Sequence, residues 1–379
     1  MCPASDGIGY KVVPIIFIFA LIVSPVTISA APTWSAMGDG MDHLVLALAV
    51  APDGTVYAGG WFTRAGGNSA WGVARWNGYE WADLGTVYHV SSLAVANDGT
   101  LYAGGSFRTA GGVVASNIAK WNGSSWSPLG NGMDGSVYAL TVAPDGTLYA
   151  GGHFQMAGEI RANGIAKWDG SSWSSLGAGL GIAGASSYPD AKGLALATNG
   201  ILYVGGDFYK AGDVPASRIA KWDGNSWSAL GSGMDHPVRS LAVTRDGTLF
   251  AGGDFSKAGG VSVNNVAKWD GSRWSRLGNG LYSYLYSLAV APNRTLYAGG
   301  MFEQNGFNNI ARWNGSSWSP LGSGTNYTVN VLAVAPDGRL YAGGAFTQAD
   351  GKSANMIAYW TPPAPGNKPL PQLLPLMDN

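Results

Sequence analysis

Few residues in this sequence could do chemistry, and their spacing suits binding better than catalysis. The four histidines are His43, His89, His153 and His236. No two of them have the spacing of a metalloprotease helix, and no Gly-x-Ser-x-Gly elbow accompanies them. The sequence therefore predicts no metal site, no cofactor and no serine nucleophile.

Aspartate and tyrosine side chains accompany these histidines. Aromatic rings cover the apolar faces of sugars, and carboxylates accept hydrogen bonds from hydroxyl groups. This combination suits sugar or peptide binding, although loops are also polar simply because they are solvated. The candidate ligand-binding residues are Asp42, His43, Tyr88, His89, Asp134, His153, Tyr188, Asp235, His236, Tyr282, Tyr284 and Tyr327.

A repeated unit would supply the elements that position these residues. An aromatic residue, a small residue and two glycines recur seven times, and successive copies start 44 to 54 residues apart. This period is that of a propeller blade. Six copies also carry two tryptophans five residues apart, such as Trp222 and Trp227. The copies begin at Tyr57, Tyr102, Tyr149, Tyr203, Phe250, Tyr297 and Tyr341.

Within one unit, turn residues separate four short runs. In the first complete unit these runs cover residues 45–50, 55–57, 72–76 and 81–84, and they are bounded by Asp-Gly and Asn-Gly. Such dipeptides accept the positive φ angles of hairpin turns, so each unit is predicted to be an antiparallel blade of four strands. No sustained 3.6-residue apolar period is present, so helix is expected to be nearly absent.

The connections of an up-and-down blade place the candidate residues on one face. His43, His89 and His236 precede a first strand, whereas His153 follows the glycine pair that ends a second strand. Both kinds of connection leave a blade at the same end. We therefore expect the candidate residues to share that face with Asp207 and Asp254.

The last unit is incomplete. It reaches Trp360 and then meets Pro362 and Pro363 before any second tryptophan. The missing piece stands near the start of the chain, where residues 34–41 match residues 227–234 almost one for one. We therefore predict an all-β fold, a seven-bladed β-propeller of four-stranded antiparallel blades in which the N-terminal strand around Trp34 completes the last blade and closes the ring.

Side by side, the glycine pair, the first tryptophan with its Asp or Asn and the second tryptophan resemble the kelch repeat of galactose-oxidase-type propellers. The resemblance covers residues 34–360, with a shorter last turn. The unit is also similar to repeats rich in Trp-Asp-Gly-Ser-Ser-Trp in secreted bacterial proteins and fungal cortical polarity markers, which implies a surface or structural role. This resemblance implies a scaffold and names no ligand. A galactose-oxidase-like copper site would require a cysteine cross-linked to a tyrosine. The one cysteine of the sequence is Cys2, which lies in the segment expected to be removed as a signal peptide, so this activity is not expected.

The ends of the chain differ from the repeats. Lys11 precedes an apolar run over residues 12–26, and small residues follow it, which predicts a signal peptide at 1–30 that includes Cys2. An uncleaved anchor is the competing interpretation, but the run is shorter than the roughly 20 residues that a bilayer requires. The propeller is then expected at 31–360, followed by a Pro-rich tail at 361–379. After cleavage, no segment is predicted to insert into a membrane.

Charge and repetition narrow the function. With 22 basic and 23 acidic residues, the formal net charge is -1, so binding to nucleic acid is not expected. The framework residues repeat, whereas the residues after the glycine pairs differ, which favours one asymmetric site over seven equal pockets. We predict a secreted or cell-surface, non-catalytic binding propeller for an extracellular glycan or protein. The alternatives are a carbohydrate-active enzyme, such as a polysaccharide lyase or hydrolase, and a purely structural envelope protein.

Overall fold

The computed structural model describes residues 32–182, 188–304 and 306–362, which belong to one compact unit, Pro32–Pro362. These residues form strands and turns and contain no helix, so none of them forms a helix that could cross a membrane. The prediction of an all-β fold built from four-stranded antiparallel sheets is confirmed. The predicted signal peptide and the tail beyond Pro362 lie outside the described residues.

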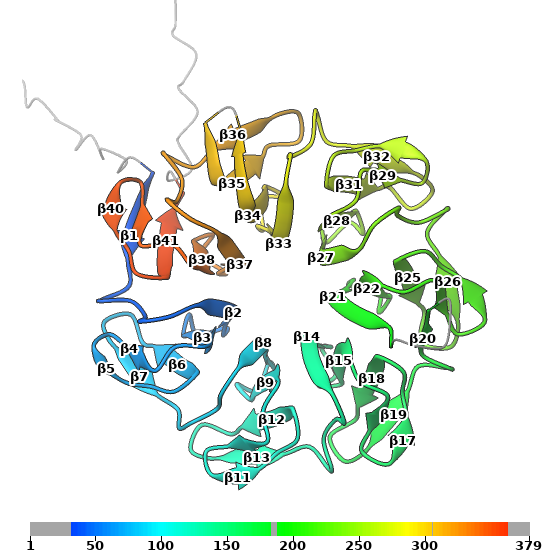
Figure 1. The fold of residues 1–379 in the computed structure, drawn as a ribbon, viewed down its shortest axis with the longest axis horizontal. Helices are drawn as coiled ribbons and strands as arrows, with labels where there is room; N and C mark the ends of the chain where they lie inside the picture. Colours follow the sequence, from blue (N-terminus) through cyan, green and yellow to red (C-terminus); the bar gives the residue numbers. More distant parts are fainter. Residues whose placement is uncertain (1–31, 183–187, 305, 363–379) are drawn as a thin grey trace, which may run out of the picture. The chain divides into compact units, whose positions relative to one another are not determined.

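Seven four-stranded sheets surround a common centre in the described residues (Figure 1). From the innermost strand outward, blades 1 and 2 consist of β2 (Val45–Val50), β3 (Val56–Gly60), β6 (Val73–Trp76) and β7 (Trp81–Asp83), and of β8 (Val90–Val95), β9 (Leu101–Gly105), β12 (Ile118–Trp121) and β13 (Trp126–Pro128). Blades 3 and 4 consist of β14 (Ser136–Val142), β15 (Leu148–His153), β18 (Ile165–Trp168) and β19 (Trp173–Ser175), and of β21 (Asp190–Leu196), β22 (Leu202–Asp207), β25 (Ile219–Trp222) and β26 (Trp227–Ala229). Blades 5 and 6 consist of β27 (Val238–Val243), β28 (Leu249–Gly253), β31 (Val266–Trp269) and β32 (Trp274–Arg276), and of β33 (Tyr284–Val290), β34 (Leu296–Gln304), β35 (Phe307–Trp313) and β36 (Trp318–Pro320). Blade 7 consists of β37 (Val329–Val334), β38 (Leu340–Gly344), β41 (Ile357–Thr361) and β1 (Thr33–Ala36).

Blade 7 is assembled from both ends of the described chain. Strand β1 pairs antiparallel with β41, and Trp34 lies opposite Trp360. A chain of hydrogen bonds then links all seven blades, because the indole N–H of each outer-strand tryptophan donates to a backbone carbonyl of the preceding blade. These donors are Trp34, Trp81, Trp126, Trp173, Trp227, Trp274 and Trp318.

The glycine pair at the end of each second strand is required by close contacts. A Cβ atom on Gly59 would lie 2.5 Å from Val90 in the next blade. A Cβ atom on Gly60 would lie 2.0 Å from the carbonyl oxygen of Leu44. The first glycine therefore lets neighbouring blades pack, and the second lets the incoming connection pass over the sheet.

Each innermost strand contains a β-bulge near its start. In blade 1 the register passes from Val45 to Ala47 and skips Leu46. The skipped residues line a cavity of about 190 Å³ that touches all seven inner strands and therefore lies on the ring axis. The skipped residues are Leu46, Ser91, Tyr138, Lys192, Arg239, Tyr286 and Asn330.

Six blades carry a short hairpin between their second and third strands, which the sequence analysis did not predict. These hairpins contain only two residues per strand, too few for periodicity to be visible. They are β4 (Arg64–Ala65) with β5 (Asn68–Ser69), β10 (Thr109–Ala110) with β11 (Val113–Val114), β16 (Met156–Ala157) with β17 (Ile160–Arg161), β23 (Lys210–Ala211) with β24 (Val214–Pro215), β29 (Lys257–Ala258) with β30 (Val261–Ser262), and β39 (Gln348–Ala349) with β40 (Lys352–Ser353). Strand β20 (Leu180–Gly181) adds to β23.

Candidate functional site

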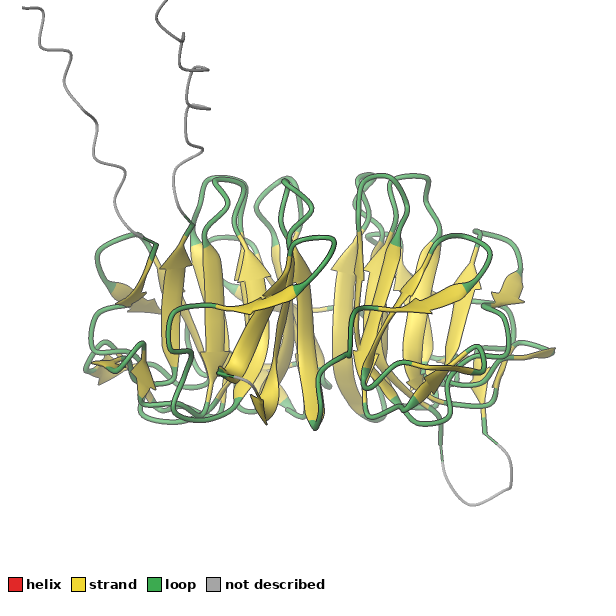
Figure 2. Ribbon diagram, turned by 90° about the horizontal axis from the view of Figure 1, so that it is seen from above, coloured by secondary structure: helices red, strands yellow, loops and turns green. Residues whose placement is uncertain are grey.

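The inner strands run between two faces, with loops at both (Figure 2). We call one the loop face: it holds the connections from one blade to the next and the segments between second and third strands. The other, the turn face, holds the tight turns between first and second strands and between third and fourth strands. Strongly exposed aromatic side chains in the described residues concentrate on the loop face, where they are Trp61, Trp71, Tyr88, Tyr188, Tyr209, Tyr282, Tyr284 and Tyr327. Tyr79 is the exposed aromatic residue of the turn face.

One group of rings lies over blades 1 and 2. Trp61 lies between His43 and His89, with centroid distances of 6.3 Å and 5.6 Å. Beside them, Trp71 meets Tyr88 edge to face at 5.5 Å. We call these five residues the aromatic platform. Three of its members were predicted from the sequence, whereas the two tryptophans were not, because neither belongs to the repeated pairs.

A second group of rings surrounds a pocket of about 450 Å³ over blade 6. Its lining includes Tyr282, Tyr327, Met301 and Glu303. The pocket exists where the chain between the second and third strands is short: it runs from Gly299 to Ile310 in blade 6, three residues fewer than from Gly59 to Val73 in blade 1. Its floor is held by Asn309, whose side chain accepts from the N–H of Phe302 and donates to the carbonyl of Thr325.

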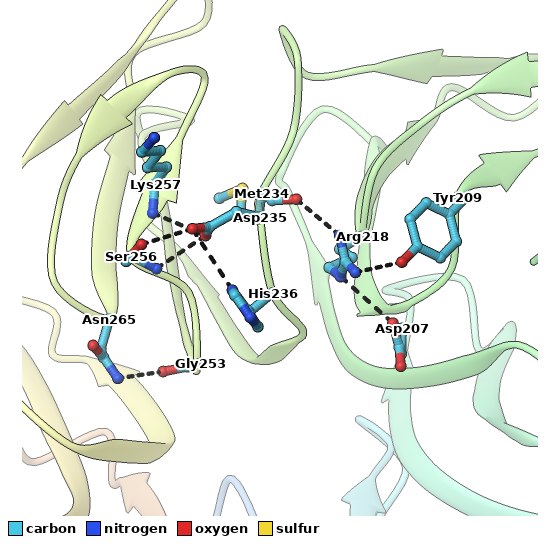
Figure 3. A network of polar contacts seen from close by, with 10 residues as sticks. All are labelled: Asp207, Tyr209, Arg218, Met234, Asp235, His236, Gly253, Ser256, Lys257 and Asn265. Carbon is cyan, nitrogen blue, oxygen red and sulfur yellow. Dashed lines mark hydrogen bonds and ion pairs between the residues drawn. The ribbon is translucent and has the colours of Figure 1, made fainter.

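The predicted ligand aspartates serve the chain itself. In Figure 3, one oxygen of Asp235 accepts the backbone N–H groups of Ser256 and Lys257 at 2.9 Å, and the other accepts the Ser256 hydroxyl at 2.7 Å. Asp42 and Asp134 hold the matching segments of blades 1 and 3, and Asn326 does so in blade 7. Their carboxylates therefore clamp backbone segments of the chain itself, and their predicted role in accepting hydrogen bonds from a ligand stays a prediction.

These clamps yield a prediction for Asp235. Replacing it with alanine leaves two backbone N–H groups without their acceptor, so we expect the free energy of unfolding to fall by about 1–3 kcal/mol. Asp235→Asn should cost less, since Asn326 makes the same backbone bonds in blade 7. Urea denaturation of the two variants measures the difference. Equal losses would show that the backbone bonds contribute nothing.

The same side chain predicts a dependence of stability on pH. Burial raises the pKa of Asp235, but the Ser256 hydroxyl and the backbone N–H groups of Lys257 and Ser256 lower it by more, so the pKa lies below the ordinary value of 3.8. A lowered pKa in the folded state contributes stability above pH 3.8, and this contribution disappears as the pH falls below it. The stability difference between the wild type and Asp235→Asn should therefore shrink between pH 5 and pH 3 in urea titrations.

Blades 3 to 5 carry ionic contacts near the loop face. His153 Nδ1 lies 2.6 Å from Asp190, whose other oxygen is 3.3 Å from Lys192 Nζ. Arg239 forms a two-pronged pair with Asp254, with both N–O distances 2.7 Å. The hydrogen bond to Asp254 raises the pKa of Arg239 against the opposing effect of burial.

Arg218 stands where the equivalent position of blade 2 has Asn117. Both have a positive φ angle, and both donate a hydrogen bond to the carbonyl of a methionine in the next connection. Arg218 also lies over the ring of Tyr209 and donates to its hydroxyl, as Figure 3 shows. Its main contacts are therefore within the protein.

Seven of the twelve candidate residues lie in three places on the loop face. His43, Tyr88 and His89 belong to the aromatic platform; Tyr282 and Tyr327 line the blade-6 pocket; and Tyr188 packs against His153. Tyr284 stacks on Tyr286, and His236 makes a loose contact with Asp235 at 3.6 Å. Whether these residues bind a ligand stays a prediction. No three His, Cys, Asp or Glu side chains are placed to hold a metal ion within the ranges that the structure describes.

Sequence reasoning missed Lys192, Arg239 and Glu303. A sequence signal for the first two does exist. The bulge position of the inner strand varies in type among the seven units, from Leu46 to Arg239, while the residues on either side of it are apolar or small in every unit. A side chain that faces the cavity on the ring axis, which we call the channel, is free to vary in this way. No such signal marks Glu303, because the pocket that it lines arises from the shortened segment of a single blade.

Comparisons with known proteins show the fold. A family model described as a domain of unknown function (DUF5122) β-propeller matches residues 51–77, 244–268 and 335–358, so the chain is similar to that family in these stretches. No curated protein sequence matches the chain. It is therefore a β-propeller repeat protein by structure and by partial sequence similarity.

Solved structures of β-propellers are similar to this chain in fold. The WD40 β-propeller domain of Doa1 is similar with a TM-score of 0.58 and 17% identity, covering 87% of this chain and 97% of that one. The RRP9 WD40 repeats have a TM-score of 0.57 and 14% identity, covering 86% and 99%. The extracellular domain of a putative one-component system from B. thetaiotaomicron has a TM-score of 0.58 and 12% identity, covering 86% of this chain and 39% of that one.

Proposed function

We propose that this chain is a secreted or cell-surface propeller of kelch-like repeats that binds an extracellular glycan at its loop face without catalysis. The observation that carries the proposal is the concentration of exposed rings on that face, with Tyr79 the exposed aromatic residue of the turn face among the described residues. Exposed aromatic side chains that gather on one surface are typical of sites where a protein contacts another molecule. The predicted signal peptide and the likeness to the extracellular domain of a putative one-component system from B. thetaiotaomicron support the location.

The geometry favours a glycan over a flat protein partner. Trp61 and its two flanking imidazoles offer ring faces on which a sugar can stack. The blade-6 pocket combines two tyrosines with the carboxylate of Glu303, which suits a sugar ring and its hydroxyl groups. Each of these two places occurs in one part of the ring and is not repeated in every blade. This agrees with a protein whose framework residues repeat and whose loop-face residues vary.

The test is binding of purified residues 31–379 to immobilised glycans. Covering an aromatic side chain contributes about 1.5–3 kcal/mol, so Trp61→Ala and Tyr327→Ala should each weaken binding about tenfold or more. Tyr79→Ala is the matched control, since Tyr79 is 90% exposed on the opposite face. Binding to glycans that is unchanged in both loop-face variants would refute this placement. Binding to immobilised extracellular proteins but to no glycan would favour a protein partner.

One contact favours the second candidate, a carbohydrate-active enzyme. Because Asp190 holds His153 through Nδ1, the ring's Nε2 atom could act as a base. Product release from a polysaccharide by the wild type, together with its loss in His153→Ala, would support the lyase or hydrolase over the binding module. Saturable binding without products supports the module.

A further inference from the structure

The axial cavity has two cationic side chains on one side. Among the seven residues at the bulge positions, Lys192 and Arg239 carry a positive charge, and they belong to β21 and β27 of adjacent blades. The two strands approach closely there: a Cβ atom on Gly193 would lie 3.2 Å from the carbonyl oxygen of Arg239. The other bulge positions carry neutral side chains.

Both cations are held in place but reach solvent. Their side chains are 27% and 33% exposed and line the cavity. Asp190 is the first residue of β21, the strand of Lys192, whereas Asp254 directly follows β28, which pairs with the strand of Arg239. Asp254 occupies Nε and Nη2 of Arg239, and the guanidinium lies 5.3 Å from the ring centroid of Tyr286. Pre-positioned cations lose little side-chain entropy when they bind an anion.

A backbone donor lies beside them. In blades 2, 5 and 6, a serine on the inner strand accepts the N–H of a leucine in the next blade, as Ser240 does from Leu288 at 2.9 Å. Blade 4 has Gly193 at this position, and a Cβ atom there would lie 3.2 Å from the nitrogen of Leu241. That N–H has no serine acceptor within the described part of the chain, and Leu241 lines the cavity.

We propose that this side of the channel, formed by Lys192, Arg239 and the Leu241 N–H, binds the anionic group of an acidic glycan, either a uronate carboxylate or a sugar sulfate. All three residues line the same cavity, and an oxyanion could accept hydrogen bonds from these donors. The residues that line the cavity lie near the start of each inner strand, which is its loop-face end, so a glycan at that face could insert its acidic group. The nature of the ligand rests on the proposed function, whereas the anion site rests on these three donors.

The experiment measures affinity by calorimetry for hyaluronan, which carries carboxylates, dextran sulfate, which carries sulfates, and neutral dextran. The wild type should bind one acidic polymer at least tenfold more tightly than dextran. Lys192→Gln and the double variant Arg239→Gln/Asp254→Asn should remove that preference; the double variant avoids leaving Asp254 unpaired. Lys221→Gln, on the third strand of the same blade, is the control and should keep it.

Free sodium glucuronate and sodium sulfate separate this proposal from glycan binding. If no polymer binds but either small anion binds the wild type and not Lys192→Gln, glycan binding at the loop face fails and the anion site stands. If all polymers bind equally and the channel variants change nothing, the anion site is overturned and glycan binding stands. If neither polymers nor small anions bind, both are overturned.

Discussion

Replacing Trp34 with alanine is expected to lower the free energy of unfolding by about 3–5 kcal/mol, the range for removing a large aromatic side chain from a core. Trp34 is 2% exposed, and its ring lies 5.6 Å from that of Trp360. Its indole N–H donates to the carbonyl of Leu321 in blade 6 at 3.0 Å. The substitution therefore leaves a cavity and removes one hydrogen bond between blades.

Trp34 differs from the other outer-strand tryptophans because β1 is far from its sheet in sequence. Hydrogen exchange should accelerate in β41 of Trp34→Ala, because the four residue pairs between β1 and β41 are weakened. Trp227→Ala is the matched control: it loses a similar ring and a similar bond to Leu176, but within a contiguous blade. Unchanged exchange in β41 of Trp34→Ala would contradict a structural role for β1 in closing blade 7.

Gly206→Ala is expected to destabilise the fold by at least about 3 kcal/mol, at or above the usual cost of overpacking a core. Its φ angle is not in the left-handed region, so the cost is steric. A Cβ atom would lie 1.8 Å from the carbonyl oxygen of Asp190, a backbone atom that cannot rotate away. The displaced strand also carries the carboxylate that holds His153 and Lys192, so the channel site should be disturbed as well.

Gly112→Ala supplies the comparison. Gly112 has a φ angle of +84° and open space around its Cβ position, so alanine there carries backbone strain of about 1–2 kcal/mol without a clash. Thermal and urea denaturation of the two variants separate steric contact from backbone strain. Equal losses would show that the close approach at Gly206 is relieved by small shifts.

Much of the fold follows from residues that repeat. The glycine pairs, the Asp-Gly turns and the paired tryptophans mark strand ends at every unit, so the strands of each blade could be located without coordinates. The matching half-units at the two ends of the propeller region pointed to Trp34 as part of the last sheet, and β1 pairs with β41. Periodicity succeeds here because each strand is specified by local turn chemistry and by an alternating buried face.

The site was less accessible to sequence reasoning. Topology alone placed the candidate residues on one face, since connections of the same kind leave a blade at the same end. It did not reveal that Asp235 clamps the segment around Ser256, because that bond joins residues far apart in the sequence. Nor did it distinguish Trp61, which gathers two histidines from different connections, from a solitary exposed ring.

Contacts and turns within one unit specify the repeating blade, its four strands and the face that carries variable residues, so these features can be predicted from the amino-acid sequence. The tertiary structure alone decided which variable residues meet: Lys192 beside Arg239, Trp61 between two imidazoles, and Glu303 in an open pocket. These meetings depend on how closely neighbouring blades pack and on a bulge that turns one side chain per inner strand toward the axis. The close approach of neighbouring blades is set by packing between units, which no single repeat encodes, whereas the bulge lies within each unit and shows only in the register of its first two strands.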